Sequence, residues 1–420
     1  MSISKYIFPF FALFVIFSDE LFNSFLLISG IFIESGMKSK EAMLIAGVAY
    51  MMMTWDILKN RFSFRNYLQF LTLFIILALY VLTGFLYPHT FIYNNYIAYL
   101  LSYGSLSIPA AYVGIRLARG GYEKAMLQLL PLFLIVVSLI VGYVVLFSAF
   151  FGFLLNGTGD GFDYQNSSYY LSYCFSYSFF YVFFYHKDNK DKKGLLSTIK
   201  YLIVIFLIFF CAVGCILGGG RGAFVYLVLI TIYLVYRVIK RSKGKNKIKY
   251  FFILGIVGVL MVIIATYFDI FHSVGAERVS KGLTTDVLRM QSWTDALNAF
   301  AESPLIGWGI GSIWWTVGFY SHNILTDFLA EMGLVGTTIM LFVIARMVIS
   351  LLHRSKNSNF DMFLLLLLLG SLVQAAFSGY WISSFKLFLI FGYVFGGYKN
   401  KREKNNNSKD TNVIRVGEDI

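Results

Sequence analysis

Residues 201–240 read YLIVIFLIFFCAVGCILGGGRGAFVYLVLITIYLVYRVIK, two apolar runs on either side of a glycine-rich turn. An apolar run of about 20 residues crosses a hydrocarbon core of roughly 30 Å as an α-helix. Because backbone polar groups inside a bilayer must be satisfied within the segment, each run is predicted to be helical. The stretch therefore predicts a transmembrane hairpin, and similar runs recur along the chain.

The composition indicates a polytopic membrane protein and excludes a soluble enzyme. Of 420 residues, 58% are hydrophobic and only 14% are charged, whereas roughly 25% are charged in soluble domains. We predict an all-α membrane domain over residues 1–398 with about twelve transmembrane helices, followed by a charged tail, 399–420, that is cytoplasmic and disordered. The predicted spans are residues 6–33, 42–58, 67–86, 94–115, 125–150, 167–185, 199–217, 222–239, 250–268, 323–345, 360–378 and 380–398.

The positive charge is explained by orientation, so no nucleic-acid partner is needed. The formal net charge is +13, yet most of the 35 lysines and arginines fall in alternate loops and in the tail. By the positive-inside rule, both termini face the cytoplasm. One long loop, residues 269–321 between the ninth and tenth predicted helices, then lies on the outer face, where long loops often carry function.

A first candidate site is the turn Gly218–Ala223, which is predicted to lie at the outer surface. Backbone N–H groups at Gly219 and Gly220, the Arg221 guanidinium and a helix N-terminus together favour a phosphate. The alternative is a tight hairpin whose arginine reaches lipid headgroups.

The outer loop carries the arginines Arg278 and Arg289 and four of the six tryptophans. A short amphipathic helix ending in a glycine-rich turn is predicted over residues 286–311. Arg289 is either a second phosphate ligand or the partner of Asp286 on the same helix face. The tryptophans, Trp293 among them, form an interfacial belt or stack against sugars.

Residues 321–336, SHNILTDFLAEMGLVG, begin a late helix at the outer face. His322 is suited to accept a proton from a hydroxyl, although a lone exposed histidine is commonly just a polar residue on the surface. At about 1.5 Å per residue, Glu331 lies on the order of 13 Å deeper and must face the bundle interior or a wet cavity.

Two further patterns are left open. Tyr164 and Gln165 precede a row of tyrosines repeated every four residues, which either lines a groove or packs between helices. Asp19 and Glu20 interrupt the first apolar run; they are either functional or pair with Lys386 across the bundle.

Taken in order, Arg221-Gly222-Ala223, Arg289 with Trp293, Pro304 to Gly309, and His322 to Gly333 resemble motifs of the O-antigen polymerase and ligase superfamily. The resemblance implies a glycosyltransferase that takes a polyprenyl-diphosphate-linked oligosaccharide as donor at the outer face of the bacterial cytoplasmic membrane. It implies catalytic roles for His322, Arg221 and Arg289. Expected substrate contacts are Gly219, Gly220, Arg278, Tyr164, Gln165, Trp293, Asn323 and Glu331.

We expect transfer without a metal ion or other cofactor, since two arginines can replace a divalent ion on a diphosphate and no outer acidic pair stands out.

The Tyr164-Gln165 pattern and the aromatic-rich spans favour an O-antigen or capsule polymerase. The alternative is a ligase that transfers the glycan to lipid A core. A lipid-oligosaccharide flippase or transporter is less favoured, because the polar groups gather on one side. Expected partners are the lipid-linked donor, membrane lipid, a flippase and a chain-length regulator.

Overall fold

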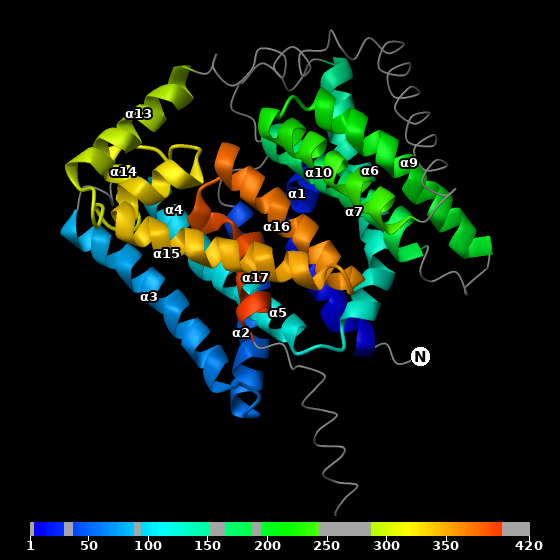
Figure 1. Cartoon of the computed structure of the whole chain (residues 1–420), viewed down its shortest axis with the longest axis horizontal. Helices are drawn as coiled ribbons and strands as arrows, with labels where there is room; N and C mark the ends of the chain where they lie inside the picture. Colours follow the sequence, from blue (N-terminus) through cyan, green and yellow to red (C-terminus); the bar gives the residue numbers. More distant parts are fainter. Residues whose placement is uncertain are drawn as a thin grey trace, which may run out of the picture.

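The computed structural model describes residues 4–28, 37–87, 94–151, 164–186, 195–242 and 287–396. Every regular element in these ranges is helical, as the sequence predicts. The α-helices (Figure 1) are α1 (Ser4–Ile28), α2 (Met37–Leu58), α3 (Phe64–Leu86), α4 (Asn94–Ser102), α5 (Ile108–Ala118), α6 (Glu123–Phe151), α7 (Tyr164–Phe180), α9 (Leu195–Leu217), α10 (Arg221–Arg241), α13 (Val287–Glu302), α14 (Ile313–Thr316), α15 (Ile324–Arg354), α16 (Asn359–Phe377) and α17 (Phe385–Phe395). Three short helices of other geometry are η2 (Tyr103–Ser107), η3 (Tyr181–Tyr185) and η5 (Trp381–Ser383).

Six described helices are long and apolar enough to cross a membrane, namely α3, α6, α9, α10, α15 and α16. The count of twelve stays a prediction, and the predicted span 250–268 lies outside the described residues. Two predicted spans are divided. Residues 94–115 contain α4, a π-helical turn and then α5, where Pro109 lies in the first turn and suits a helix start because it lacks an N–H.

The last predicted span, 380–398, contains only the 11-residue α17 after a 3₁₀ turn. The hydroxyls of Ser383 and Ser384 donate to the Tyr380 carbonyl at 3.0 and 3.2 Å. Such local bonds compete with a continuous α-helix, so the chain enters α17 later than its apolar pattern predicts.

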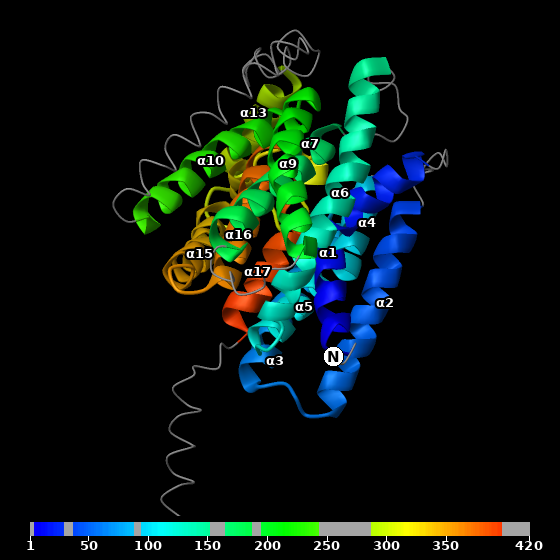
Figure 2. The same ribbon diagram turned by 90° about the vertical axis from the view of Figure 1, so that its right-hand side faces the viewer.

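Helix α17 packs along α5 in the middle of the bundle, between α15 on one side and α2 on the other (Figure 2). The approach is close enough that a Cβ at Gly114 would meet the Leu389 carbonyl and one at Gly392 would meet the Ala111 carbonyl. Small residues at both faces let two backbones touch, as is common between membrane helices.

The buried side chains form two cores. One lies among α1, α6, α7, α9, α10 and α16, and the other joins α3, α4 and α5 to α14 and the start of α15. Tyr169, Tyr173 and Tyr177 are fully buried in the first core. For these three tyrosines the packing interpretation is therefore the correct one.

Helix α15 is broken at Gly333, whose backbone has φ 60° and ψ −164°. Segment 304–309 takes up the backbone groups that the break leaves. The N–H groups of Trp308 and Gly309 donate to the carbonyls of Ala330 and Glu331 at 3.1 and 2.8 Å. In return, the N–H groups of Leu334 and Val335 donate to the carbonyls of Pro304 and Leu305 at 2.8 and 3.1 Å.

At the end of the bundle predicted to be cytoplasmic, the buried Asp56 of α2 gathers basic side chains from the α2–α3 turn and from the C-terminal end of α5. Its carboxylate lies 3.3 Å from both Arg61 and Arg119 and accepts a hydrogen bond from the Tyr112 hydroxyl at 2.9 Å. A buried carboxylate is stable when it is paired and hydrogen-bonded. The cluster therefore fixes the ends of α2, α3 and α5.

The break at Gly333 generates a prediction. Gly333→Ala should lower the free energy of unfolding by at least ~1–2 kcal/mol, because an L-residue is disfavoured at positive φ and the added Cβ would meet the Leu305 backbone. Thermal unfolding of the purified protein in detergent measures this. Gly47→Ala is the control, since a Cβ at Gly47 meets nothing within 4 Å and should be neutral or stabilising by up to about 1 kcal/mol. Equal melting of the two variants would contradict the assignment.

Candidate functional site

The glycine-rich turn before α10 rests on the start of α7. Gly219 has φ 70°, and the Gly220 N–H donates to the Ser168 hydroxyl at 3.2 Å. Arg221 is the first residue of α10 and is partly buried. The turn thus holds a guanidinium at the positive end of a long helix dipole, an arrangement that suits an anion.

The amphipathic helix predicted after residue 286 is α13, and it places Arg289 and Trp293 one turn apart on the same face. Arg289 lies within electrostatic range of the Tyr169 hydroxyl. The indole Nε1 of Trp293 is buried and has no hydrogen-bond partner among the described residues. An N–H donor without an acceptor beside a guanidinium is a place where a ligand oxygen would be stabilised.

Tyr169 connects this arginine with the turn before α10. Its hydroxyl lies so close to Gly222 that any Cβ there would collide with it, and it accepts a hydrogen bond from the Ser378 hydroxyl at 3.4 Å. The structure therefore gathers Arg289 and the Arg221 turn around one tyrosine.

His322 lies in a tight turn that leads into α15. Its backbone has φ 60°, which is uncommon for a residue other than glycine and costs conformational energy. The buried Asp327 carboxylate holds the turn by accepting hydrogen bonds from the Ser321 N–H at 2.9 Å and the Ser321 hydroxyl at 2.6 Å. Asn323 caps α15 by accepting from the Leu325 N–H at 2.9 Å.

The imidazole of His322 packs against Tyr320, with ring centroids 4.4 Å apart. The Tyr320 hydroxyl in turn donates to the carbonyl of Ser378 at 3.5 Å. Ser378, just beyond the C-terminus of α16, thus contacts both Tyr169 and Tyr320. Ser378 therefore connects the turn that carries His322 with Arg289 and the turn that carries Arg221.

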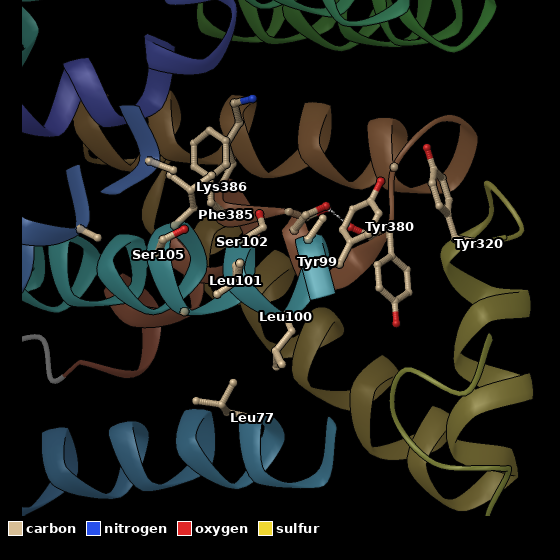
Figure 3. A pocket seen from close by; sticks show the side chains of 18 of the residues that line it. Leu77, Tyr99, Leu100, Leu101, Ser102, Ser105, Tyr320, Tyr380, Phe385 and Lys386 are labelled. Atoms are coloured by element: carbon tan, nitrogen blue, oxygen red, sulfur yellow. Dashed lines mark hydrogen bonds between the residues drawn. The ribbon is translucent and has the colours of Figure 1, made fainter. Parts of the chain in front are cut away.

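A cavity of about 970 Å³ begins at Tyr320 and Ser378 and runs between α4, η2, α16 and α17. In Figure 3, Tyr320 and Tyr380 lie at one end of the cavity, and Lys386 lies with Phe385 at the other. Its lining is rich in serine hydroxyls and aromatic rings and includes the Gln374 amide, which donates to Asn166 Oδ1 at 2.9 Å. Such a mixture of ring faces and hydrogen-bonding groups is typical of ligand pockets.

The aromatic rings that line this cavity are those of Phe385 and of four tyrosines, Tyr50, Tyr99, Tyr320 and Tyr380. Trp314 is fully buried behind them, stacked on Tyr99 at 5.0 Å, and Trp308 donates its indole N–H to the Ala299 carbonyl at 2.8 Å. Neither the belt nor the sugar-stacking interpretation describes these two tryptophans, because both build the second core.

Glu331 is fully buried, in agreement with an orientation into the bundle interior, but its oxygens are used by the protein itself. They accept hydrogen bonds from the Tyr380 hydroxyl, from the Trp381 indole at 2.9 Å and from the Gly311 N–H at 3.0 Å. Glu331 thereby ties α15 to the turn before α17 and to the glycine-rich segment, and its predicted contact with substrate stays a prediction.

The structure describes some of the other residues that the sequence singled out, but not all of them. Gln165 lies in the first turn of α7, beside Asn166 in the cavity wall. Arg278, the side chain of Tyr164, and the proposed partners Asp286, Asp19 and Glu20 lie outside the described residues or side chains. Lys386 is described; its ammonium donates to the Tyr170 hydroxyl at 3.0 Å.

Sequence reasoning missed Ser378, Tyr380 and Gln374. Gln374 and Ser378 fall in the predicted span 360–378 and Tyr380 begins the next, 380–398, so the one signal was the polarity of these side chains within apolar runs. Among the described residues, no cluster of three or more histidine, cysteine, aspartate or glutamate side chains is placed to hold a metal ion.

A family model described as O-antigen ligase matches residues 205–341, about a third of the chain. The match includes Arg221, Arg289 and His322. No curated protein and no solved structure shows a significant match to the chain.

The role of Asp327 can be tested locally. Asp327→Ala removes the oxygen, Oδ1, that accepts both hydrogen bonds from Ser321. Because hydrogen bonds to a charged group contribute about 1.5–3 kcal/mol, amide exchange in residues 319–323 should accelerate roughly 10- to 100-fold. Hydrogen–deuterium exchange with mass spectrometry measures it. Asp327→Asn keeps the accepting oxygen and should exchange almost as slowly as the parent protein; fast exchange in this control, or slow exchange in the alanine variant, would show that the carboxylate does not hold the turn.

Proposed function

We propose, from the match of residues 205–341 to the family model described as O-antigen ligase, that the protein is an O-antigen or capsular polysaccharide polymerase. It transfers glycan from a polyprenyl-diphosphate donor to a hydroxyl of an acceptor repeat at the outer face of the bacterial cytoplasmic membrane, with both termini in the cytoplasm. The observation that carries the proposal is the convergence of Arg221, Arg289 and His322 around Tyr169 and Ser378, at the mouth of a large polar and aromatic cavity.

The two arginines supply what the leaving group needs. When the bond between the sugar C1 and the phosphate oxygen breaks, its electron pair stays on the lipid diphosphate. Guanidinium groups present paired N–H donors that match phosphate oxygens. Because Arg221 and Arg289 are held by the fold before the reaction, they stabilise the developing charge without reorganisation.

His322 accepts the proton of the acceptor hydroxyl as its oxygen forms the new bond to C1. The strained backbone at His322 and the Asp327 hydrogen bonds to Ser321 fix the direction of the imidazole. A base held in place in this way contributes through orientation as well as proton transfer. The reaction balances without a metal ion or redox cofactor, since one bond forms, one breaks and one proton moves to histidine.

The cavity offers room for a sugar-containing substrate next to this base. Its volume of about 970 Å³ lies near the upper end of ligand pockets, which are typically ~300–1,000 Å³. Tyr99, Tyr320 and Tyr380 present ring faces, and Gln374 and Asn166 present amides. A lipid-linked donor delivered by a flippase, and a chain-length regulator acting on the product, would be the partners of such an enzyme.

A ligase is the second candidate. The matching family model is described by that activity, and both enzymes break the same sugar–phosphate bond, so the arginine cluster suits either. They differ in the acceptor alone: a glycan repeat for the polymerase and lipid A core for the ligase.

If Arg221 and Arg289 bind the diphosphate, a positive charge at these two positions is not sufficient for activity. Arg221→Lys and Arg289→Lys should each lower polysaccharide synthesis roughly 100- to 1,000-fold, the usual effect of removing a preorganised donor, because an ammonium lacks the paired fork. Arg65→Lys, at an exposed arginine of α3, is the matched control and should retain activity. Chain formation from a defined lipid-linked donor by purified protein provides the measurement, and wild-type rates in both site variants would remove the diphosphate argument.

The base assignment predicts that His322→Ala lowers transfer by about 100- to 10,000-fold while the protein still reaches the membrane and binds donor.

In a strain that lacks the gene, electrophoresis of the polysaccharide separates a polymerase from a ligase. A single repeat attached to core indicates a lost polymerase; bare core with stored lipid-linked polymer indicates a lost ligase and would overturn our first choice. Loss of donor on the outer face, with intact polymerising activity in membranes, would indicate a transporter.

A further inference from the structure

A second pocket lies at the opposite end of the bundle, far along the helices from His322 and Arg221. It has a volume of about 610 Å³ and lies between the C-terminal ends of α10 and α15 and the N-terminus of α16. The distribution of basic residues predicts that this end is cytoplasmic. The catalytic proposal does not use this pocket.

The pocket is strongly basic. Its lining has no aspartate or glutamate among the described residues. The basic side chains in it are Arg237, Lys240, Arg241, His353 and Lys356. Cations gathered in one concave site repel one another, so an anion bound among them would stabilise the fold.

Arg237 is fixed at the junction of the helices. Its Nη2 donates to the Ser355 carbonyl at 2.9 Å, while Nη1 donates to the Ser355 hydroxyl at 3.3 Å and to the Tyr233 hydroxyl at 3.0 Å. Every one of these acceptors is neutral. The guanidinium is therefore oriented by the fold while its charge remains available to an anion.

The other cations surround this arginine on exposed positions. Lys240 donates to the Tyr236 hydroxyl at 3.3 Å, and Lys356 lies in the turn between α15 and α16. The acid nearest in sequence, Asp361, points elsewhere, because it pairs with Arg354 at 2.7 Å and accepts from Tyr393 at 2.9 Å. In the Asp56 cluster, by contrast, one buried carboxylate offsets the positive charge of the arginines.

One side of the pocket rim is apolar. Ile349 and Leu352 line it and are 62% and 37% exposed, and Met362 and Phe184 also contribute. A free phosphate would use only the basic part. A phospholipid would use both parts, because its phosphate meets the cations while its acyl chains lie along the apolar rim.

We propose that this pocket binds the phosphate of an anionic phospholipid from the adjacent leaflet. Basic pockets between helices at the cytoplasmic side are suited to such headgroups, and the volume lies within the range of small-molecule sites. The bound lipid bridges α10 to the α15–α16 turn, which Arg237 already joins through Ser355.

The test is lipid binding by the full-length protein, purified in detergent and analysed by native mass spectrometry with added phosphatidylglycerol or phosphatidylcholine. The parent protein should retain phosphatidylglycerol at least tenfold better. The triple substitution Lys240→Gln, Arg241→Gln, Lys356→Gln changes exposed residues and should weaken phosphatidylglycerol binding roughly 10- to 100-fold, since each basic group near an anionic lipid contributes measurably.

The control removes equal charge from other exposed positions at the same end of the bundle, Lys59→Gln, Arg65→Gln and Lys124→Gln, and should bind as the parent does. Lys356→Gln alone serves if the triple variant folds poorly, and it should lose part of the preference. Equal loss in the control would indicate general surface attraction and overturn the site. Stabilisation by inorganic phosphate at millimolar concentration without lipid preference would overturn the lipid assignment.

Discussion

The exchange of backbone hydrogen bonds between segment 304–309 and the broken helix α15 is the interaction on which the end of the molecule that carries His322 depends. A break in a helix leaves N–H and C=O groups without partners, and inside a bilayer water cannot satisfy them. Here the glycine-rich segment satisfies them in both directions across Gly333. Glu331 then extends the same connection by side-chain bonds to Gly311, Tyr380 and Trp381.

This connection explains why a chain segment outside the long helices can be part of a rigid site. Segment 304–309 follows α13, which carries Arg289, and α15 follows the His322 turn. Because the break joins the two, Arg289 and His322 are held by one continuous hydrogen-bonded unit. Tyr169 and Ser378 attach that unit to the Arg221 turn.

The sequence predicted the helical class and the helix after residue 286, since these follow from local pattern. The roles of the arginine and histidine motifs, which the family resemblance implies, stay predictions. The sequence did not predict the break at Gly333, although Gly333 and Gly336 were conspicuous, because a glycine in an apolar run is equally consistent with close helix packing. Nor did it predict Ser378 as the contact between two tyrosines. That role depends on the packing of α16 close to α7 and α15 in the folded protein, and no local periodicity in the sequence indicates this packing.

The meeting of Tyr169, Ser378 and Tyr320 has a consequence for the biogenesis of the protein. Arg221, Arg289 and His322 leave the ribosome well before Ser378, so the nascent chain carries every proposed reacting group before the contact that gathers them exists. The site is completed only when α16 has been inserted. An incompletely inserted chain therefore carries its arginines and histidine without the contact that gathers them.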